Sequence, residues 1–155
     1  MQRAPPRWSS SLRDAHATPQ VSRARSLDEL FARCEVVSLH LPLTSATRQL
    51  VDARLIALMP RGAYLLNTAR GELVVMDAVV DALHSGQLGG YAADVFESEP
   101  LPPGHPLTAC PNTVLTPHIG SRTHESVRRR ALMAAENLVL MLDGQPPHAL
   151  ATIMP

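Results

Sequence analysis

Short apolar runs alternate with amphipathic stretches along most of this chain. The apolar runs lack the polar alternation of half-exposed strands, which is typical of strands buried on both faces of a parallel sheet. The predicted strands are 35–41, 63–68, 90–96 and 113–116, and the predicted helices are 26–34, 53–59, 77–85 and 123–144. This order predicts an α/β fold, a doubly wound parallel sheet with helices on both faces.

Capping residues precede each predicted helix. Ser26 with Glu29 forms a capping box, and Asp52 and Thr123 have the side-chain oxygen that an N-cap needs. For the third helix we expect Asp77 to be the cap, because Val75 and Met76 before it have no such oxygen.

Three polar segments directly follow predicted strands, with the sequences NTARG (67–71), DVFESEP (94–100) and TPHIG (116–120). In a parallel sheet the strand carboxyl ends meet at one edge, where ligands bind. We therefore expect Arg70, Glu99 and His118 at a common edge. An arginine fork can bind a carboxylate, and a histidine beside a glutamate can move a proton.

Each of these residues also has an ordinary structural interpretation. Arg70 could close the turn before Gly71, Glu97 competes with Glu99, and His118 could pack at a strand end. Asp94 could cap a strand or pair with an arginine. The remaining histidines are interpreted as structural: His16, His40, His84, His105, His124 and His148.

The composition excludes several functional classes. With 155 residues, 45% of them hydrophobic, the chain can form one core. The 14 basic residues are all arginine, so Walker-type phosphate loops and Schiff-base chemistry, which need lysine, are excluded. Net charge is zero, and no aromatic residues interrupt the run 128–130, which we interpret as a solvated helix face. We expect no nucleic-acid partner.

Two cysteines, Cys34 and Cys110, lack the spacing of a metal site or a redox pair. They favour a reducing, cytoplasmic location. No apolar run approaches the roughly 20 residues of a membrane span, so we expect no membrane association. We predict no metal site.

Residues 1–25 are rich in arginine and serine and contain one acid, Asp14. Such a segment can mimic an organelle transit peptide, but a poorly ordered leader or the remnant of an interrupted element is the favoured interpretation. The predicted organisation is therefore a leader (1–25), a partial nucleotide-binding domain (26–144) and a C-terminal tail (145–155).

Four segments in register carry a family resemblance. They are HLPLT (40–44) with Thr47, NTARGEL (67–73), GGYAADVFESEP (89–100) and TPHIG (116–120). From about Ser26 to Gly144 the chain resembles the nucleotide-binding domain of the D-isomer-specific 2-hydroxyacid dehydrogenases. The resemblance implies a partial Rossmann-like fold and hydride transfer between NAD, or NADP, and a small 2-hydroxy or 2-oxo acid.

The resemblance also implies roles for individual residues. Arg70 would anchor the substrate carboxylate, His118 would donate and accept the proton, and Glu99 would be the partner of His118. Asp94 would contact the nicotinamide carboxamide. The cofactor-binding set implied in this way is Leu41, Pro42, Leu43, Thr44, Thr47, Thr68, Ala69, Arg70, Asp94, His118 and Gly120.

The chain departs from the family pattern at two points. It has no glycine-rich GxGxxG turn for the pyrophosphate and no room for a separate substrate domain. Residues 7–11 are interpreted as a remnant of the second strand, where Ser9 or Ser10 cannot accept hydrogen bonds as a carboxylate does, which leaves NAD and NADP both open. We expect the chain alone to be weakly active or inactive.

A missing first strand would leave the strand at 35–41 unpaired on one edge. With Val36, Val37 and Leu39 there, we expect self-association, for example as a homodimer.

Two other functions are compatible with the same residues. The C-terminal-binding corepressors share the fold and the ESEP sequence while acting as partner-binding modules, so the chain could be a non-catalytic dinucleotide-binding protein. It could also be a truncated product without activity.

Overall fold

The computed structural model describes residues 6–7 and 22–148. Most of the predicted leader lies outside the described residues, including Ser9, Ser10 and His16. The chain forms two compact units, Met1–Pro117 and His118–Pro155. The predicted boundaries near residues 25 and 144 stay predictions.

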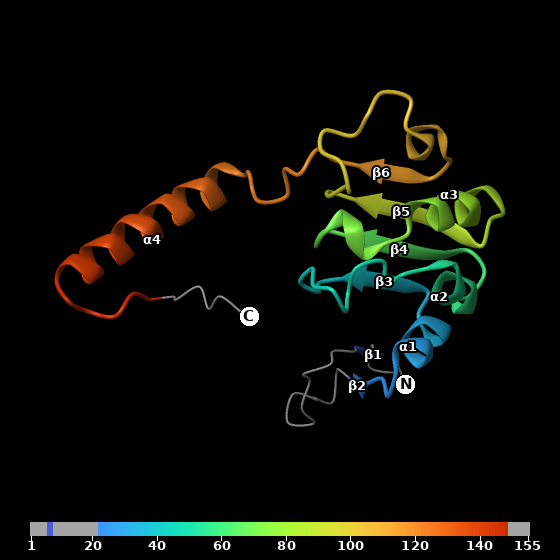
Figure 1. Ribbon diagram of the computed structural model, residues 1–155, viewed down its shortest axis with the longest axis horizontal. Coiled ribbons are helices and arrows are strands. Elements are labelled where there is room, and N and C mark those ends of the chain that lie inside the picture. The colour runs from blue at the N-terminus through green and yellow to red at the C-terminus, as the bar shows by residue number, and fades with distance from the viewer. Residues whose placement is uncertain (1–5, 8–21, 149–155) are drawn as a thin grey trace. The chain divides into compact units, whose positions relative to one another are not determined.

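The first unit contains a four-stranded parallel sheet in the order β3-β4-β5-β6 (Figure 1). Its strands are β3 (Val36–Leu39), β4 (Ala63–Asn67), β5 (Leu88–Ala93) and β6 (Thr113–Leu115). A separate parallel pair joins β1 (Pro6–Arg7) to β2 (Ser22–Arg23). The predicted α/β class with a parallel sheet is confirmed.

Helices α1 (Leu27–Arg33), α2 (Ala53–Leu58) and α3 (Met76–His84) alternate with these strands. Each crossover leads to the next strand in the same direction, and right-handed crossovers of this kind place their helices on one face of the sheet. Side chains from alternate strand positions meet the helices there.

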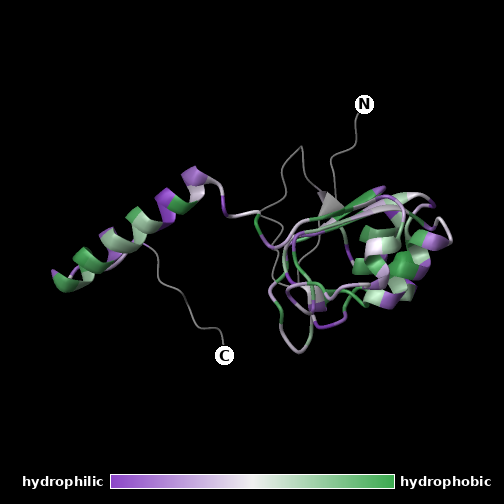
Figure 2. Ribbon diagram, turned by 90° about the horizontal axis from the view of Figure 1, so that it is seen from above, coloured by the Kyte–Doolittle hydropathy of each residue, from purple (hydrophilic) through white to green (hydrophobic). Residues whose placement is uncertain are grey.

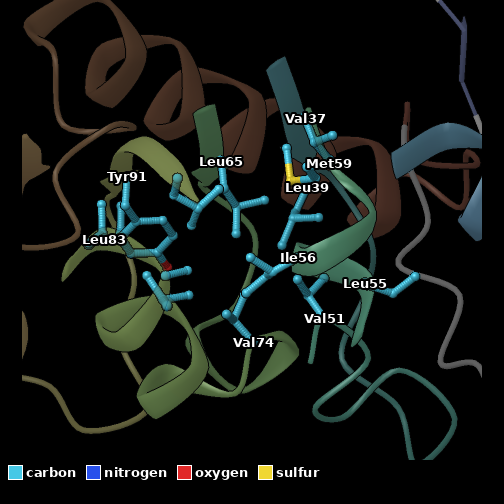
Figure 3. Packing of buried hydrophobic residues seen from close by; sticks show 14 of the residues in the cluster. Val37, Leu39, Val51, Leu55, Ile56, Met59, Leu65, Val74, Leu83 and Tyr91 are labelled. Carbon is cyan, nitrogen blue, oxygen red and sulfur yellow. The ribbon is translucent and has the colours of Figure 1, made fainter. Parts of the chain in front are cut away.

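The hydrophobic core lies between this face and the helices. Figure 3 shows Leu39 and Leu65 of the sheet beside Ile56 of α2, and Tyr91 beside Leu83 of α3. These side chains are all buried. Burial of this apolar surface is the main stabilising contribution to the first unit.

The opposite face of the sheet is exposed within the described part of this unit. Val36, Tyr64 and Val114 point to it and are 56%, 52% and 67% exposed. The expected covering by helices on both faces is therefore found on one face only among the described residues.

The predicted caps form hydrogen bonds at three helices. Ser26 Oγ accepts from the Glu29 N–H at 3.1 Å, and Asp52 Oδ1 accepts from the Leu55 N–H at 2.9 Å. In the second unit Thr123 Oγ1 accepts from the Ser126 N–H at 3.2 Å.

Helix α3 begins differently from the prediction. Its N-cap is Val75, which makes no side-chain capping bond, and Asp77 lies inside the first turn. The reason is a bridge between Val51 and Val74, after which the Val75 N–H donates to the Val51 carbonyl at 2.9 Å. The extended segment therefore ends at Val75, and Asp77 interacts favourably with the helix dipole instead of capping.

Strand β5 also has other bounds than predicted, starting at Leu88 and ending at Ala93. The start is earlier because Leu88 pairs with Ala63. The end is earlier because the Phe96 N–H donates to the Glu99 carboxylate rather than to a strand.

The second unit consists mainly of α4 (His124–Leu142), the long helix that the sequence predicted. None of its residues is buried, and Figure 2 shows hydrophobic and hydrophilic residues along its length. Gly144 ends it with a φ of 69°. Arg128 and Arg130 are exposed, in agreement with a solvated helix face.

Among the described helices none is long and apolar enough to cross a membrane. The described residues also include no group of three or more histidine, cysteine, aspartate or glutamate side chains placed to hold a metal ion.

Candidate cofactor and catalytic site

A hollow of about 570 Å³ lies at the carboxyl ends of β3 and β4. Two segments line it, one after each strand: His40, Leu41, Pro42 and Leu43, and Thr68, Ala69 and Arg70. Six of these seven residues belong to the predicted cofactor-binding set, and His40 was expected to be only structural. The structure therefore brings together two segments that are 25 residues or more apart in the sequence.

The first segment is braced by threonines. The Thr47 hydroxyl donates to the Pro42 carbonyl at 2.7 Å and accepts from the Thr44 N–H at 2.8 Å. Thr44 and Thr47 also share a hydroxyl contact of 3.1 Å. These bonds fix the loop that carries Pro42 and Leu43 beside the hollow.

The second segment is held by Asn67, the last residue of β4. Its side chain is fully buried, donates from Nδ2 to the Arg70 carbonyl at 2.8 Å, and accepts at Oδ1 from the Ala69 N–H at 3.1 Å. Sequence reasoning did not select Asn67. The available signal was an amide residue at the end of an apolar strand, where a buried polar group must find partners.

Arg70 stands at the rim of the hollow with an exposed side chain. Its Nη1 donates to the Ala69 carbonyl at 2.6 Å. A guanidinium has five N–H donors in a fixed fork. This bond uses one of them, and the remaining donors can form a bidentate contact with a carboxylate.

Asp94 follows β5 and is linked to both neighbouring strands. Its N–H donates to the Asn67 carbonyl at 3.1 Å, and its Oδ1 accepts from the Thr116 hydroxyl at 2.5 Å. Asp94 is half-buried. Thr116, which follows β6, is a second residue that sequence reasoning passed over, and its hydroxyl orients the Asp94 carboxylate.

Glu99 lies on the loop after β5, and its side chain turns back toward the backbone of the same loop. Its Oε1 accepts from the Phe96 N–H at 2.9 Å. The same backbone lies against Gly71, the residue after Arg70, so closely that a Cβ at position 71 would overlap the Phe96 carbonyl carbon. The Arg70 and Glu99 loops are thus in direct contact through Gly71.

His118 and Gly120 belong to the second unit, whereas Arg70, Asp94 and Glu99 belong to the first. His118 is exposed and has a φ of 53°. Left-handed backbone at a residue other than glycine is uncommon and is found often at functional positions. The pairing of Glu99 with His118 stays a prediction.

Other histidines make local contacts. His40 Nε2 lies 2.9 Å from the Ser38 hydroxyl, within hydrogen-bond distance. His105 Nδ1 accepts a hydrogen bond from the Leu107 N–H at 3.2 Å. His84 Nε2 lies 3.9 Å from the Sγ of Cys110, and burial raises the pKa of that thiol. A raised pKa disfavours the reactive thiolate.

The residues around the hollow fit part of a dinucleotide. Apolar side chains at 41–43 offer a surface for a flat ring, and the Arg70 fork stands at the rim. The sequence contains no GxGxxG turn to bind a pyrophosphate. These residues alone could therefore hold only part of a dinucleotide.

A parallel sheet with a hollow at the strand carboxyl ends is the architecture of dinucleotide-binding α/β domains. Residues 7–120 match the model for the D-isomer specific 2-hydroxyacid dehydrogenase, NAD binding domain. Since this match covers well over half of the chain, the chain belongs to that family. The resemblance inferred from the four sequence segments is confirmed.

Relatives with established names support this assignment. The chain is 49% identical over 124 residues to a glyoxylate reductase of Thermofilum pendens, covering 80% of this chain and 37% of the relative. It is 40% identical over 119 residues to a formate dehydrogenase of Pseudomonas sp., covering 77% of this chain and 30% of the relative. The chain thus spans about a third of the length of these relatives.

Solved structures agree with the fold. The apo D-mandelate dehydrogenase of Rhodotorula graminis has a TM-score of 0.86 at 30% identity, covering 97% of this chain and 44% of that chain. A D-isomer specific 2-hydroxyacid dehydrogenase of Xanthobacter autotrophicus Py2, in complex with NADPH and MES, has a TM-score of 0.78 at 38% identity, covering 92% of this chain and 58% of that chain.

Proposed function

We propose that this chain forms part of the cofactor and substrate site of an NAD- or NADP-dependent oxidoreductase that acts on a small 2-hydroxy or 2-oxo acid. The observation that supports this most directly is the hollow lined by residues 40–43 and 68–70 with Arg70 at its rim. The family match and the names of the relatives, glyoxylate reductase among them, point to the same chemistry.

In this proposal Arg70 binds the substrate carboxylate, for which its planar fork and permanent charge are suited. His118 donates the proton to the carbonyl oxygen during reduction and accepts it during oxidation. Glu99 favours the protonated imidazole of His118, because an adjacent carboxylate stabilises the cationic form.

The nicotinamide supplies or takes up the hydride when it is bound. Thr68 and Ala69 lie on its ribose side in this proposal, whereas Leu41, Pro42 and Leu43 line the adenosine and pyrophosphate side of the cofactor. Asp94, oriented by Thr116, is assigned to the carboxamide. A cytoplasmic location is part of the proposal, in keeping with two free cysteines among the described residues.

Calorimetric titration of NADH and NADPH into the purified chain tests cofactor binding, after far-UV circular dichroism has established that the chain is folded. Saturable binding supports the proposal and shows which cofactor is preferred. A folded chain that binds neither cofactor contradicts it.

A second experiment tests the substrate class by following NADH absorbance with glyoxylate, hydroxypyruvate and other 2-oxo acids. Arg70→Lys is the matched variant, since it keeps a positive charge and removes the fork. The proposal requires that this variant lose activity toward the acid while its affinity for NADH changes little. Equal activity of both proteins would contradict the role of Arg70.

The proposal also includes self-association through β3. This strand pairs only with β4 among the described strands, and its Val36 side chain is 56% exposed. However, Val37 and Leu39 point into the core, so their apolar surface is not part of the edge. An unpaired edge with an exposed valine is a template for another strand.

Light scattering coupled to size exclusion tests this part. Val36→Lys should shift the protein toward the monomer, because a lysine on an edge strand disfavours pairing. The matched control is Tyr64→Lys, which changes an equally exposed residue on the neighbouring inner strand. A monomeric wild-type protein, or equal effects of both variants, would contradict association through this edge.

A further inference from the structure

Asn67 is the one polar residue among the buried side chains of the described core, and its side chain is completely enclosed. Burying an amide is unfavourable unless its hydrogen bonds are made. At this position the amide makes two of them to the same loop, one to the Arg70 carbonyl and one to the Ala69 N–H. A leucine or valine would fill the space without that cost. The amide is therefore better explained by its hydrogen bonds to the loop than by packing.

The main chain of Asn67 contributes a third bond, because its carbonyl accepts from the Asp94 N–H at 3.1 Å. One residue is therefore bonded to the segment that carries Arg70 and to the residue that begins the next polar segment. Both segments lie at the carboxyl edge of the sheet, and the first lines the hollow.

A second buried polar group, the Tyr91 hydroxyl, lies near the Asn67 amide. The buried Tyr91 hydroxyl has no hydrogen-bond partner within bonding geometry. Burial raises the pKa of this phenol to about 12, and the nearby Asn67 amide acts in the opposite direction. The Asn67 side chain thus uses one of its two N–H donors and its acceptor oxygen on the loop.

We propose that Asn67 is a positioning residue that holds residues 68–70 in the conformation the cofactor and substrate site requires. It touches neither ligand in this proposal and acts through the Ala69 N–H and the Arg70 carbonyl. The importance of this position for ligand binding rests on the proposed function, whereas its effect on the loop does not.

Residue-resolved amide hydrogen exchange by NMR, with and without NADH, tests the proposal in the full chain. In Asn67→Ala both loop bonds are lost, so we expect the Ala69 amide to exchange about tenfold faster or more, while amides of β4 and β5 change much less. NADH should bind correspondingly more weakly. Equal acceleration of loop and sheet amides would show a general loss of stability and overturn the proposal.

Two further variants separate the loop bonds from packing. Asn67→Asp keeps an acceptor for the Ala69 N–H and loses the donor to Arg70, so Ala69 should stay protected where this variant folds. Tyr91→Phe changes the same buried surroundings and retains both loop bonds, so it should leave Ala69 exchange unchanged. Ala69 exchange that is accelerated in Tyr91→Phe as much as in Asn67→Ala would overturn the proposal.

The readouts distinguish the two claims. A wild-type chain that protects Ala69 in an Asn67-dependent way but binds no NADH would refute the proposed function and retain the loop assignment. A wild-type chain that binds NADH with the same affinity as Asn67→Ala would retain the proposed function and refute Asn67 as a positioning residue.

Discussion

The backbone of Gly71 lies directly against the backbone of Phe96, with no room for a side chain at position 71. Gly71 follows Arg70 and begins the short helix η2 (Gly71–Leu73), while Phe96 donates its N–H to the Glu99 carboxylate. This contact therefore fixes the spacing between the two loops that carry the proposed carboxylate anchor and the proposed partner of the histidine.

Replacing Gly71 with alanine should disrupt this contact. The added Cβ would overlap the Phe96 carbonyl carbon and the Glu97 nitrogen, and backbone atoms cannot move aside as a flexible side chain can. We expect Gly71→Ala to lower the free energy of unfolding by about 3 kcal/mol or more, measured by urea denaturation.

Gly104→Ala is the matched control for this experiment. Gly104 has a φ of 74° and open space around it, so its substitution tests backbone strain without overlap. A cost of about 1–2 kcal/mol is expected there. If the two variants were equally stable, close packing at Gly71 would not be important.

The hydrogen bond from Thr116 to Asp94 should contribute measurably to stability. Thr116→Val preserves the shape of the side chain and removes the donor, which leaves the half-buried Asp94 carboxylate with one partner fewer. We expect a loss of about 1 kcal/mol in the free energy of unfolding. Thr113→Val, in the preceding strand β6, removes only a 3.5 Å contact to the Cys110 carbonyl and should cost less. The reverse order would contradict the assignment.

The parallel sheet and most helices could be predicted from the sequence because periodicity and caps act locally. Ser26, Asp52 and Thr123 each cap the predicted helix, and each needs only neighbouring residues to do so. The start of α3 could not be predicted in the same way. It depends on the bridge between Val51 and Val74, which are 23 positions apart in the chain.

The candidate site shows the same distinction. The segments around Pro42 and Arg70 were predicted because their sequences resemble a family, and the structure places them around one hollow. The bracing residues Asn67 and Thr116 were missed, because their importance lies in bonds to other segments. The exposed sheet face at Tyr64 was also not predicted, since apolar strand runs do not show which face lacks a cover.

Removal of the Asp52 cap should destabilise the first unit. The Asp52 carboxylate accepts from the Leu55 N–H at 2.9 Å and carries a negative charge at the start of α2. Asp52→Ala should lower the free energy of unfolding by about 1 kcal/mol. Asp52→Asn keeps a capping oxygen and should lower it by only about 0.3 kcal/mol. Urea denaturation of the two variants checks the order, and an alanine variant as stable as the asparagine variant would show that α2 does not need this cap.

The buried Tyr91 hydroxyl should make the protein sensitive to alkaline pH. Burial raises its pKa from 10.0 to about 12 in the folded protein, so between these values the unfolded chain loses the phenol proton and the folded protein keeps it. The unfolded state binds fewer protons in this window, and stability therefore falls as pH rises, by up to about 1.4 kcal/mol per pH unit from this group. Below pH 10 the group contributes no pH dependence.

Tyr91→Phe removes this titration and also a buried hydroxyl without a partner within bonding geometry. The variant should be about as stable as the wild type, or more stable, at pH 8, and its free energy of unfolding should fall less steeply between pH 10 and 11.5. Urea denaturation at a series of pH values measures both slopes. Since Cys34 and Cys110 are unchanged between the two proteins, the difference in slope reports Tyr91, and parallel slopes would mean that its phenol proton is no harder to remove in the folded protein than in the unfolded chain.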